Sequence, residues 1–229
     1  MASLLAELLA VVPVCVISGG AFGQFQSQLI AGLPASASAL LGNLYLLPTC
    51  GTQYYLYEDG AWVQQYAENL TDAEKQLTLS VLERTARELG LWESKTWGPI
   101  LEDRGSQITF SALGQDAPVD AKRAWDPTGA RKESLRAPAA ALLPGLEVRS
   151  GGSTSIDVTR KGIDKAYGMR KLADLTGITL DRMLFVGDRL DPGGNDYPVK
   201  AMGVRTHAVS DWEDTAEFVS QFLTERRGS

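Results

Sequence analysis

Carboxylates gather in the segment Gly187–Asp196, which follows the apolar run Met183–Val186 and contains Asp188, Asp191 and Asp196 within a glycine-rich turn. Carboxylates held close together repel one another unless a cation neutralises them, and oxygen ligands of this kind suit Mg²⁺. A magnesium site is therefore the economical interpretation. The ordinary alternative is a solvated acidic loop built from common turn residues.

Two further positions have residue types that bind phosphate. Ser18-Gly19-Gly20 follows the apolar run Val14–Ile17, so a hydroxyl and unhindered backbone amides stand at the start of the next helix, where a phosphate oxygen fits. The same pattern is equally typical of a serine cap and a glycine turn. Lys165 follows Gly162, and by itself it is typical of a surface lysine.

These groups are scattered in sequence but share a place in the predicted topology. Each of the three groups follows a predicted strand or starts a predicted helix. A fourth polar segment, Thr49-Cys50-Gly51, also follows a predicted strand. In an open α/β sheet, ligands bind outside the carboxyl ends of the strands. We therefore expect these side chains to converge at one rim of a sheet.

The first part of the chain alternates between helices and short apolar strands, which indicates a parallel α/β sheet. A hairpin is expected around Asp59-Gly60. The predicted elements are a helix Ala2–Val11, a strand Val14–Ile17, a helix Phe22–Ala31, a strand Leu44–Leu47, and the hairpin strands Tyr54–Tyr57 and Trp62–Gln65.

A different pattern follows, which predicts an inserted α+β layer with the order helix, two strands, helix, two strands. The first helix begins with a capping box at Thr71 and Glu74, and its apolar stripe is Leu77, Val81, Leu82 and Leu89. The remaining segments are strands Ile100–Arg104 and Gln107–Leu113, helical sequence from Val119 to about Leu143 with a break at 127–129, and strands Leu146–Arg149 and Ser155–Thr159.

The α/β alternation then resumes, so the chain is expected to form a discontinuous core from residues 1–70 and 155–229, with 71–154 inserted. The last predicted elements are a helix Lys165–Thr176, strands Met183–Val186 and Val204–Ala208, and a helix Trp212–Leu223.

Composition limits the classes of function. The 229 residues are 44% hydrophobic and carry a formal net charge of −6, with a pI near 4.9. This balance argues against nucleic-acid and anionic-membrane partners. Cys15 and Cys50 lie in apolar runs, so we expect buried reduced thiols and a cytoplasmic setting. His207 is the only histidine, which excludes histidine-rich zinc sites.

The ordered motifs resemble those of the haloacid-dehalogenase (HAD) phosphohydrolases. The second, third and fourth motifs of that superfamily are similar to Ser18-Gly19-Gly20, to Gly162-Ile163-Asp164-Lys165, and to Gly187-Asp188 with Gly194-Asn195-Asp196. The insert resembles the type IIB cap. The resemblance is closest to the phosphomannomutase branch, so it implies a Rossmann-like HAD core with an inserted αββαββ cap.

The resemblance also assigns roles. It implies that Ser18 and the amides of Gly19 and Gly20 bind the transferring phosphoryl group, that Lys165 neutralises its charge, and that Asp188 is the main Mg²⁺ ligand. Asn195 and Asp196 would orient the metal or bind it through water. In the cap, Ser155 and Asp157 resemble residues that hold sugar hydroxyls, and Arg104 resembles an arginine that binds the distal phosphate.

Two positions depart from the family pattern. The first motif, Asp-x-Asp-x-Thr/Val, supplies the nucleophile and does not occur in this sequence. We expect it to lie before Met1, on a central strand between Val14–Ile17 and Met183–Val186, whose omission leaves unpaired backbone groups. The second departure is Gln115, which stands where mutases carry another phosphate-binding arginine.

Three hypotheses result. The leading one is a Mg²⁺-dependent phosphatase that hydrolyses a small phosphorylated metabolite, with a sugar phosphate favoured, through an aspartyl-phosphate. The alternatives are a phosphomannomutase, which the loss of the arginine disfavours, and a non-catalytic homologue that only binds a phosphorylated ligand. The oligomeric state stays open, and a homodimer through the cap is one option.

Overall fold

The computed structural model describes residues 1–227, and the chain divides into two compact units. The core unit comprises Met1–Ala67 and the chain from Asp164 onward, and the inserted unit comprises Glu68–Ile163. The predicted boundary at 154/155 differs from this division. Strand β8 (Ser155–Arg160) pairs with β6 (Ile108–Ser111) and β7 (Leu146–Ser150) of the insert, so its hydrogen bonds place it in the inserted unit.

The first sheet of the core unit has the order β1-β2-β3-β4. Its strands are β1 (Val14–Ile17), β2 (Leu44–Leu47), β3 (Gln53–Glu58) and β4 (Ala61–Ala67). The β1 and β2 strands are parallel, and β3 and β4 form the predicted hairpin. Its turn requires positive φ at Asp59 (50°) and Gly60 (82°), which explains the Asp-Gly pair.

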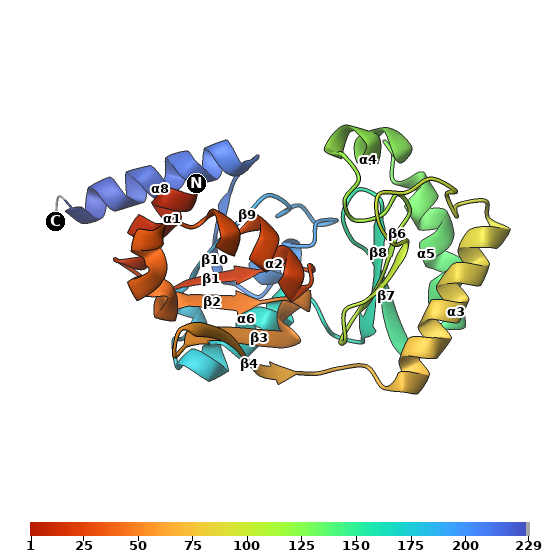
Figure 1. The fold of residues 1–229 in the computed structure, drawn as a ribbon, viewed down its shortest axis with the longest axis horizontal. Helices are drawn as coiled ribbons and strands as arrows, with labels where there is room; N and C mark the ends of the chain where they lie inside the picture. Colours follow the sequence, from red (N-terminus) through yellow and green to blue (C-terminus); the bar gives the residue numbers. More distant parts are fainter. Residues whose placement is uncertain (228–229) are drawn as a thin grey trace. The chain divides into compact units, whose positions relative to one another are not determined.

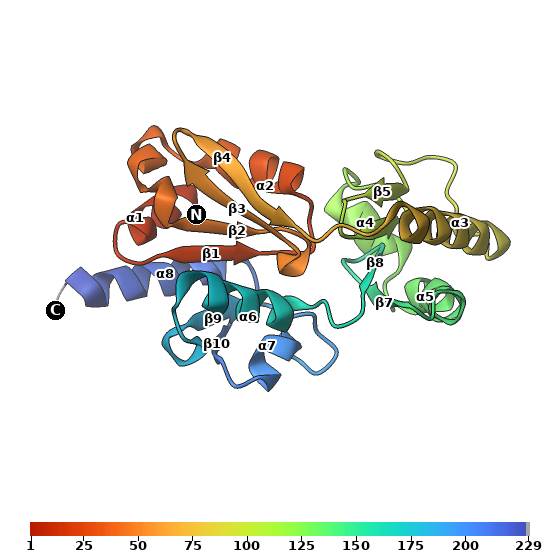
Figure 2. The ribbon, with the colours of Figure 1, turned by 90° about the horizontal axis from the view of Figure 1, so that it is seen from below.

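A second sheet contains only β9 (Leu184–Gly187) and β10 (Arg205–Ala208), which are parallel. In Figure 2 the strands follow one another as β4, β3, β2, β1, β9, β10. Within residues 1–227, β1 pairs only with β2, and β9 only with β10. The core strands therefore form two sheets, and β1 and β9 each have an unpaired edge, in agreement with the unpaired backbone groups predicted beside these strands. Leu184 is 45% exposed although it lies in a strand.

Helices cover both faces of the first sheet (Figure 1). Alternate residues of β2 point to opposite faces: Leu44 and Leu46 pack with α1 (Ala2–Leu9) and α2 (Phe22–Gln28), whereas Leu47 packs with Leu172 of α6 (Lys165–Thr176). The other core helices are α7 (Tyr197–Ala201), which the sequence analysis missed, and α8 (Trp212–Arg227).

Short 3₁₀ segments complete the core unit at Ile30–Gly32, Ala35–Asn43, Thr49–Gly51 and Leu180–Arg182. Across residues 1–227, none of the helices combines the length and the apolar character needed to cross a bilayer.

The inserted unit is one antiparallel sheet backed by helices. Its strands are β5 (Leu101–Asp103), β6 (Ile108–Ser111), β8 and β7 (Leu146–Ser150), in the order β5-β6-β8-β7, and its helices are α3 (Asp72–Glu88), α4 (Val119–Trp125) and α5 (Ala130–Leu142). Ile108, Phe110, Ile156 and Val158 face the helices. The alternate residues Thr109, Ser111, Ser155 and Asp157 form the opposite side, the polar face.

The predicted apolar stripe of α3 is wrong at two positions. Leu77 and Leu89 are 53% and 42% exposed. Val81 and Leu82 are buried as predicted. The other buried residues of α3 are Thr78, Thr85 and Ala86, which lie on the same helical face. The buried face of α3 therefore includes two threonines, which were not part of the predicted stripe.

Candidate functional site

Ser18 directly follows β1 and shapes the loop that leads into α2. Its Oγ accepts a hydrogen bond from the amide of Gly20 at 3.1 Å. A Cβ on Gly20 would lie 2.7 Å from Oε1 of Gln24, which caps the amide of Ala21. A hydroxyl that accepts one bond keeps its proton to donate, so the loop can present Ser18 to a phosphate oxygen.

A strained turn holds this loop in place. Thr49, Cys50 and Gly51, at the end of β2, have φ values of 49°, 57° and 90°, a conformation that L-residues rarely adopt. The amide of Cys50 donates to the carbonyl of Ser18 at 2.9 Å, and the amide of Thr49 donates to Gly20 at 3.1 Å. The Thr49–Gly51 turn therefore fixes the Ser18 loop to the neighbouring strand.

The same turn positions helix α6. A Cβ on Gly168 would lie 2.7 Å from the carbonyl oxygen of Cys50, and one on Gly51 would lie 2.6 Å from Cα of Gly168. Only glycine permits backbones to approach this closely. Lys165 lies one turn before Gly168 on α6, so it stands at the same end of the sheet as Ser18.

Lys165 is the first residue of α6, directly after the capping residue Asp164. Its Nζ forms a salt bridge with Oδ1 of Asp196. The other oxygen of Asp196 accepts from the amide of Arg189 at 3.1 Å, and the amide of Asp196 returns a bond to the carbonyl of Arg189 at 3.2 Å. Asp196 thus closes the loop after β9 and holds the lysine.

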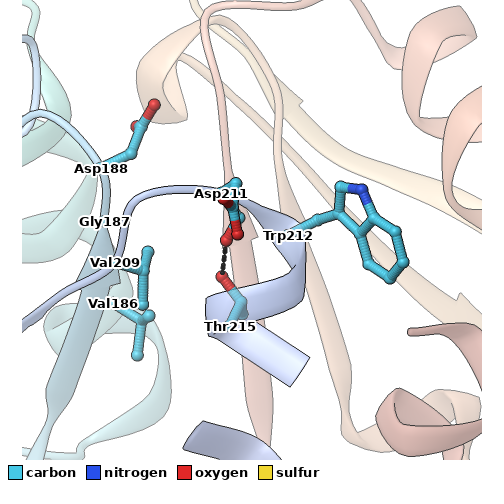
Figure 3. A pocket seen from close by; sticks show the side chains of 7 residues that line it. All are labelled: Val186, Gly187, Asp188, Val209, Asp211, Trp212 and Thr215. Atoms are coloured by element: carbon cyan, nitrogen blue, oxygen red, sulfur yellow. Dashed lines mark hydrogen bonds between the residues drawn. The ribbon is translucent and has the colours of Figure 1, made fainter. Parts of the chain in front are cut away.

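Asp188 lines a pocket of about 300 Å³ at the carboxyl end of β9 (Figure 3). The other lining residues are Val186, Gly187 and Val209, with Asp211, Trp212 and Thr215 from the start of α8. Asp211 receives hydrogen bonds from Thr215 and from the amide of Asp214, both at 2.9 Å, so it serves as a helix cap. In Figure 3 the Asp188 side chain projects away from that pair.

The side-chain oxygens of the loop after β9 decide whether Mg²⁺ can bind there. Asp188 and Asn195 are exposed, whereas Asp196 is occupied by Lys165 and Arg189. No group of three or more His, Cys, Asp or Glu side chains within residues 1–227 is arranged to hold a metal. Mg²⁺ commonly uses one or two protein carboxylates and completes its shell with phosphate and water. The exposed Asp188 and Asn195 have the oxygen ligand types that such a shared site uses, and they do not form a site made of protein alone.

The polar face of the inserted unit carries the three predicted cap residues. Arg104 Nη2 pairs with Oε2 of Glu102 at 2.6 Å. Asp157 Oδ1 accepts from Thr109 at 2.8 Å, and the hydroxyls of Ser111 and Ser155 lie 3.2 Å apart. Burial raises the pKa of Asp157, more than the nearby Arg104 guanidinium and the bond from Thr109 lower it.

Gln115 joins the same network. Its Nε2 donates to Ser111 Oγ at 2.6 Å, and its main-chain carbonyl oxygen accepts from Lys122 Nζ at 2.6 Å. The position at which mutases carry an arginine is therefore filled by a neutral side chain that bonds to the polar face.

The structure brings together some of the predicted residues. Lys165 contacts the segment that contains Asp188 and Asp196, and the Ser18 loop reaches the same rim through the Thr49–Gly51 turn. Asp191, whose acidity had no assigned role, pairs with Arg189 at 3.1 Å. The roles themselves stay predictions. Sequence reasoning missed the pocket walls from α8, because Asp211 and Asp214 signal only a helix start.

Residues 1–225 match the family described as eukaryotic phosphomannomutase. A phosphomannomutase of Spinacia oleracea is 27% identical over 237 residues, an alignment that covers 99% of this chain and 89% of the relative.

Solved structures share the fold at low identity. An IMP-bound IMP-nucleotidase of Plasmodium falciparum aligns with a TM-score of 0.66 at 14% identity, covering 97% of this chain and 62% of that one, so this chain spans less than two thirds of its length. A haloacid dehalogenase-like hydrolase from Bacteroides thetaiotaomicron aligns with a TM-score of 0.59 at 14% identity. This alignment covers 96% of this chain and 90% of that one.

Proposed function

Because the chain belongs to the eukaryotic phosphomannomutase family, with the HAD fold, we propose that it is a Mg²⁺-dependent phosphatase in the cytoplasm. Its substrate would be a small phosphorylated metabolite, with sugar phosphates favoured. The observation that carries the proposal is the salt bridge between Lys165 and Asp196. The salt bridge holds the Lys165 ammonium group against the loop that also carries Asp188. The Ser18 loop lies at the same rim of the sheet.

The groups of the core unit have distinct tasks in this proposal. Ser18 and the amides of Gly19 and Gly20 donate to the oxygens of the transferring phosphoryl group, and Lys165 offsets the charge that develops on it. Asp188 and Asn195 would hold Mg²⁺, which supplies further charge neutralisation when bound. Asp196 keeps Lys165 in position.

Formation of an aspartyl-phosphate needs a carboxylate nucleophile, and no Asp-x-Asp occurs in the chain. In our proposal it comes from a strand between β1 and β9. The unpaired edges of these two strands support that location, because buried strand edges require hydrogen-bond partners.

The test is a protein extended by the residues encoded in frame before Met1. It should release phosphate from a panel of sugar phosphates with Mg²⁺ and not with a chelator, and Asp188→Asn should abolish the release. If the folded extended protein releases phosphate from no member of the panel, the phosphatase proposal is contradicted.

A phosphomannomutase is the second candidate, which the family match over residues 1–225 favours. Gln115 argues for hydrolysis instead, because a mutase must hold a bisphosphate in two orientations and needs cations at its distal site. Products from mannose 1-phosphate separate the two. A mutase yields the 6-phosphate, and a phosphatase yields free mannose.

The third candidate is a homologue that binds a phosphorylated ligand without turnover, which the missing Asp-x-Asp favours. A stop codon directly before Met1 in the gene would support it. An in-frame Asp-x-Asp on an apolar strand would remove its basis.

A further inference from the structure

Tyr66 stands near the end of β4 and contacts the turn and the helix that carry groups of the candidate site. Its hydroxyl donates to the carbonyl oxygen of Gly51 at 2.7 Å, and Nζ of Lys171 on α6 lies 5.2 Å from the centre of its ring. Gly51 ends the strained turn that bonds to the Ser18 loop, and α6 begins with Lys165. One side chain therefore joins both elements to β4.

A β-bulge aims Tyr66 at this turn. Residues two apart on a regular strand share a face of the sheet. Gln64, however, lies opposite Tyr55 and donates to its hydroxyl at 2.6 Å, on the side where Tyr55 packs with α2. Tyr66 lies opposite Tyr54, on the side where Tyr54 packs with α6.

The register shift between these two cross-strand pairs accounts for the change of face. Without the extra residue, Tyr66 would point to the same side as Gln64, away from α6. Bulges occur next to functional sites, where they re-aim a side chain. The bulge in β4 therefore indicates that the direction of Tyr66 matters to the rim of the sheet.

The turn that Tyr66 contacts needs restraint from outside. Thr49 and Cys50 have positive φ values, and such a conformation persists only where the surrounding structure holds it. The hydroxyl of Thr52 bonds to the carbonyl and hydroxyl oxygens of Thr49 at 2.8 and 2.7 Å, but these bonds stay within the turn. The bond from Tyr66 spans 15 residues and ties Gly51 to another strand.

A change in this turn reaches two of the proposed phosphate-binding groups. The amide of Cys50 donates to the carbonyl of Ser18, and Gly51 packs closely on Gly168 in the first turn of α6. Both contacts come from the same short segment. If the turn relaxes toward ordinary φ values, the Ser18 loop and the start of α6, with Lys165, move with it.

We propose that Tyr66 is a positioning residue for phosphate binding, which acts through the turn at Gly51 on the Ser18 loop and on Lys165. The inference rests on the proposed function and deepens it, because it names the side chain that sets the geometry of the phosphate-binding groups from a distance.

Titration of the chain with inorganic phosphate in the presence of Mg²⁺, followed by the NMR signals of the Gly19 and Gly20 amides, tests this inference. Tyr66→Phe removes the hydroxyl and keeps the ring. The dissociation constant should rise by roughly fivefold, the usual effect of one lost hydrogen bond. The amide signals of Gly19 and Lys165 should already differ from the wild type before phosphate is added.

Tyr57→Phe is the matched control, because it removes a hydroxyl from the same hairpin near the other end of β3. It should bind phosphate as the wild type does. Thr52→Ala loosens the turn from within and should also weaken phosphate binding, so it decides the matter if Tyr66→Phe does not fold.

A tyrosine that only stabilises the fold would lower the unfolding temperature and leave the dissociation constant unchanged well below it. That result in Tyr66→Phe, or unchanged binding in folded Thr52→Ala, would overturn the inference and leave the phosphatase proposal standing. If the wild-type chain does not bind phosphate at all, both the inference and the proposed phosphate site are overturned.

Discussion

Lys165 and Asp196 form a salt bridge between the first residue of α6 and the loop after β9, and Asp196 is only 1% exposed. Both carboxylate oxygens of Asp196 have partners, since the second accepts from the amide of Arg189. Gly187 has no Cβ, and one would lie 2.5 Å from that oxygen. The loop is therefore shaped around this carboxylate, which acts on Lys165 as a positioning group.

Asp196→Asn should destabilise the core unit by about 3 kcal/mol, because it leaves the partly buried Lys165 without its counter-charge. Asp191→Asn, in the same loop, removes an exposed partner of Arg189 and should cost less than about 1 kcal/mol. Guanidinium denaturation of the two variants measures the difference. Equal losses would show that the burial of Asp196 does not matter energetically.

Gly168→Ala should destabilise the protein by about 2 kcal/mol, because its Cβ would lie 2.7 Å from the carbonyl oxygen of Cys50. The helix-propensity gain from alanine offsets only part of this cost. Gly23→Ala in α2 is the matched control, since a Cβ there has nothing within 4 Å, and it should gain up to about 1 kcal/mol. Thermal unfolding that ranks the two variants the other way would contradict the close packing of α6.

The sequence predicted element types well where local signals are strong. The limits of β1, β2 and α6 agree with the predicted ranges, and the Asp59-Gly60 turn has the expected positive φ values. The break in the helical stretch falls between α4 and α5 as expected at 127–129.

The failures have tertiary causes. Helix α7 is short and follows a glycine turn, so it gives too few residues for a periodic signal. The buried face of α3 includes Thr78 and Thr85, which only packing on α5 determines. In the candidate site, motifs pointed to Ser18, Lys165 and Asp188. No local pattern could show that Asp196 binds Lys165, because this pair joins α6 to the loop after β9 and depends on the folded backbone.

Backbone amides on the unpaired edges of β1 and β9 should exchange with deuterium faster than those of β6 and β8. Among residues 1–227, β1 and β9 each have a partner strand on one side only, whereas β6 and β8 each lie between two strands. Unpaired amides lack the hydrogen bonds that slow exchange. Mass spectrometry of peptides that cover each strand tests this in the chain as given.

The extended protein described under the proposed function provides the comparison for exchange. If an added strand occupies the space between β1 and β9, protection of those two strands should rise while that of β6 and β8 stays constant. Protection of β1 and β9 equal to that of β6 in the chain as given would argue that their edges are already paired.

The capping box of α3 should make stability depend on acid pH. The pKa of Glu74 is lowered from 4.5 to about 2, first by the hydrogen bond from the amide of Thr71 and then by Arg160 of β8. A group whose pKa is lower in the folded state stabilises the fold above its ordinary pKa and loses that contribution as pH falls through the folded value. The contribution of Glu74 should therefore be complete at pH 6 and disappear between about pH 4.5 and 2.

Glu74→Gln measures that contribution. The variant should be less stable than the wild type by about 0.5 to 1 kcal/mol at pH 6, the usual size of a cap interaction, and the two proteins should converge near pH 2. Other carboxyl groups titrate equally in both proteins, so urea unfolding at a series of pH values isolates Glu74 by difference. Glu88→Gln, at the last residue of α3 where a negative charge is unfavourable, should show no such loss at pH 6. A difference between Glu74→Gln and wild type that persists unchanged at pH 2 would mean that the ionised carboxylate is not the source of the stabilisation.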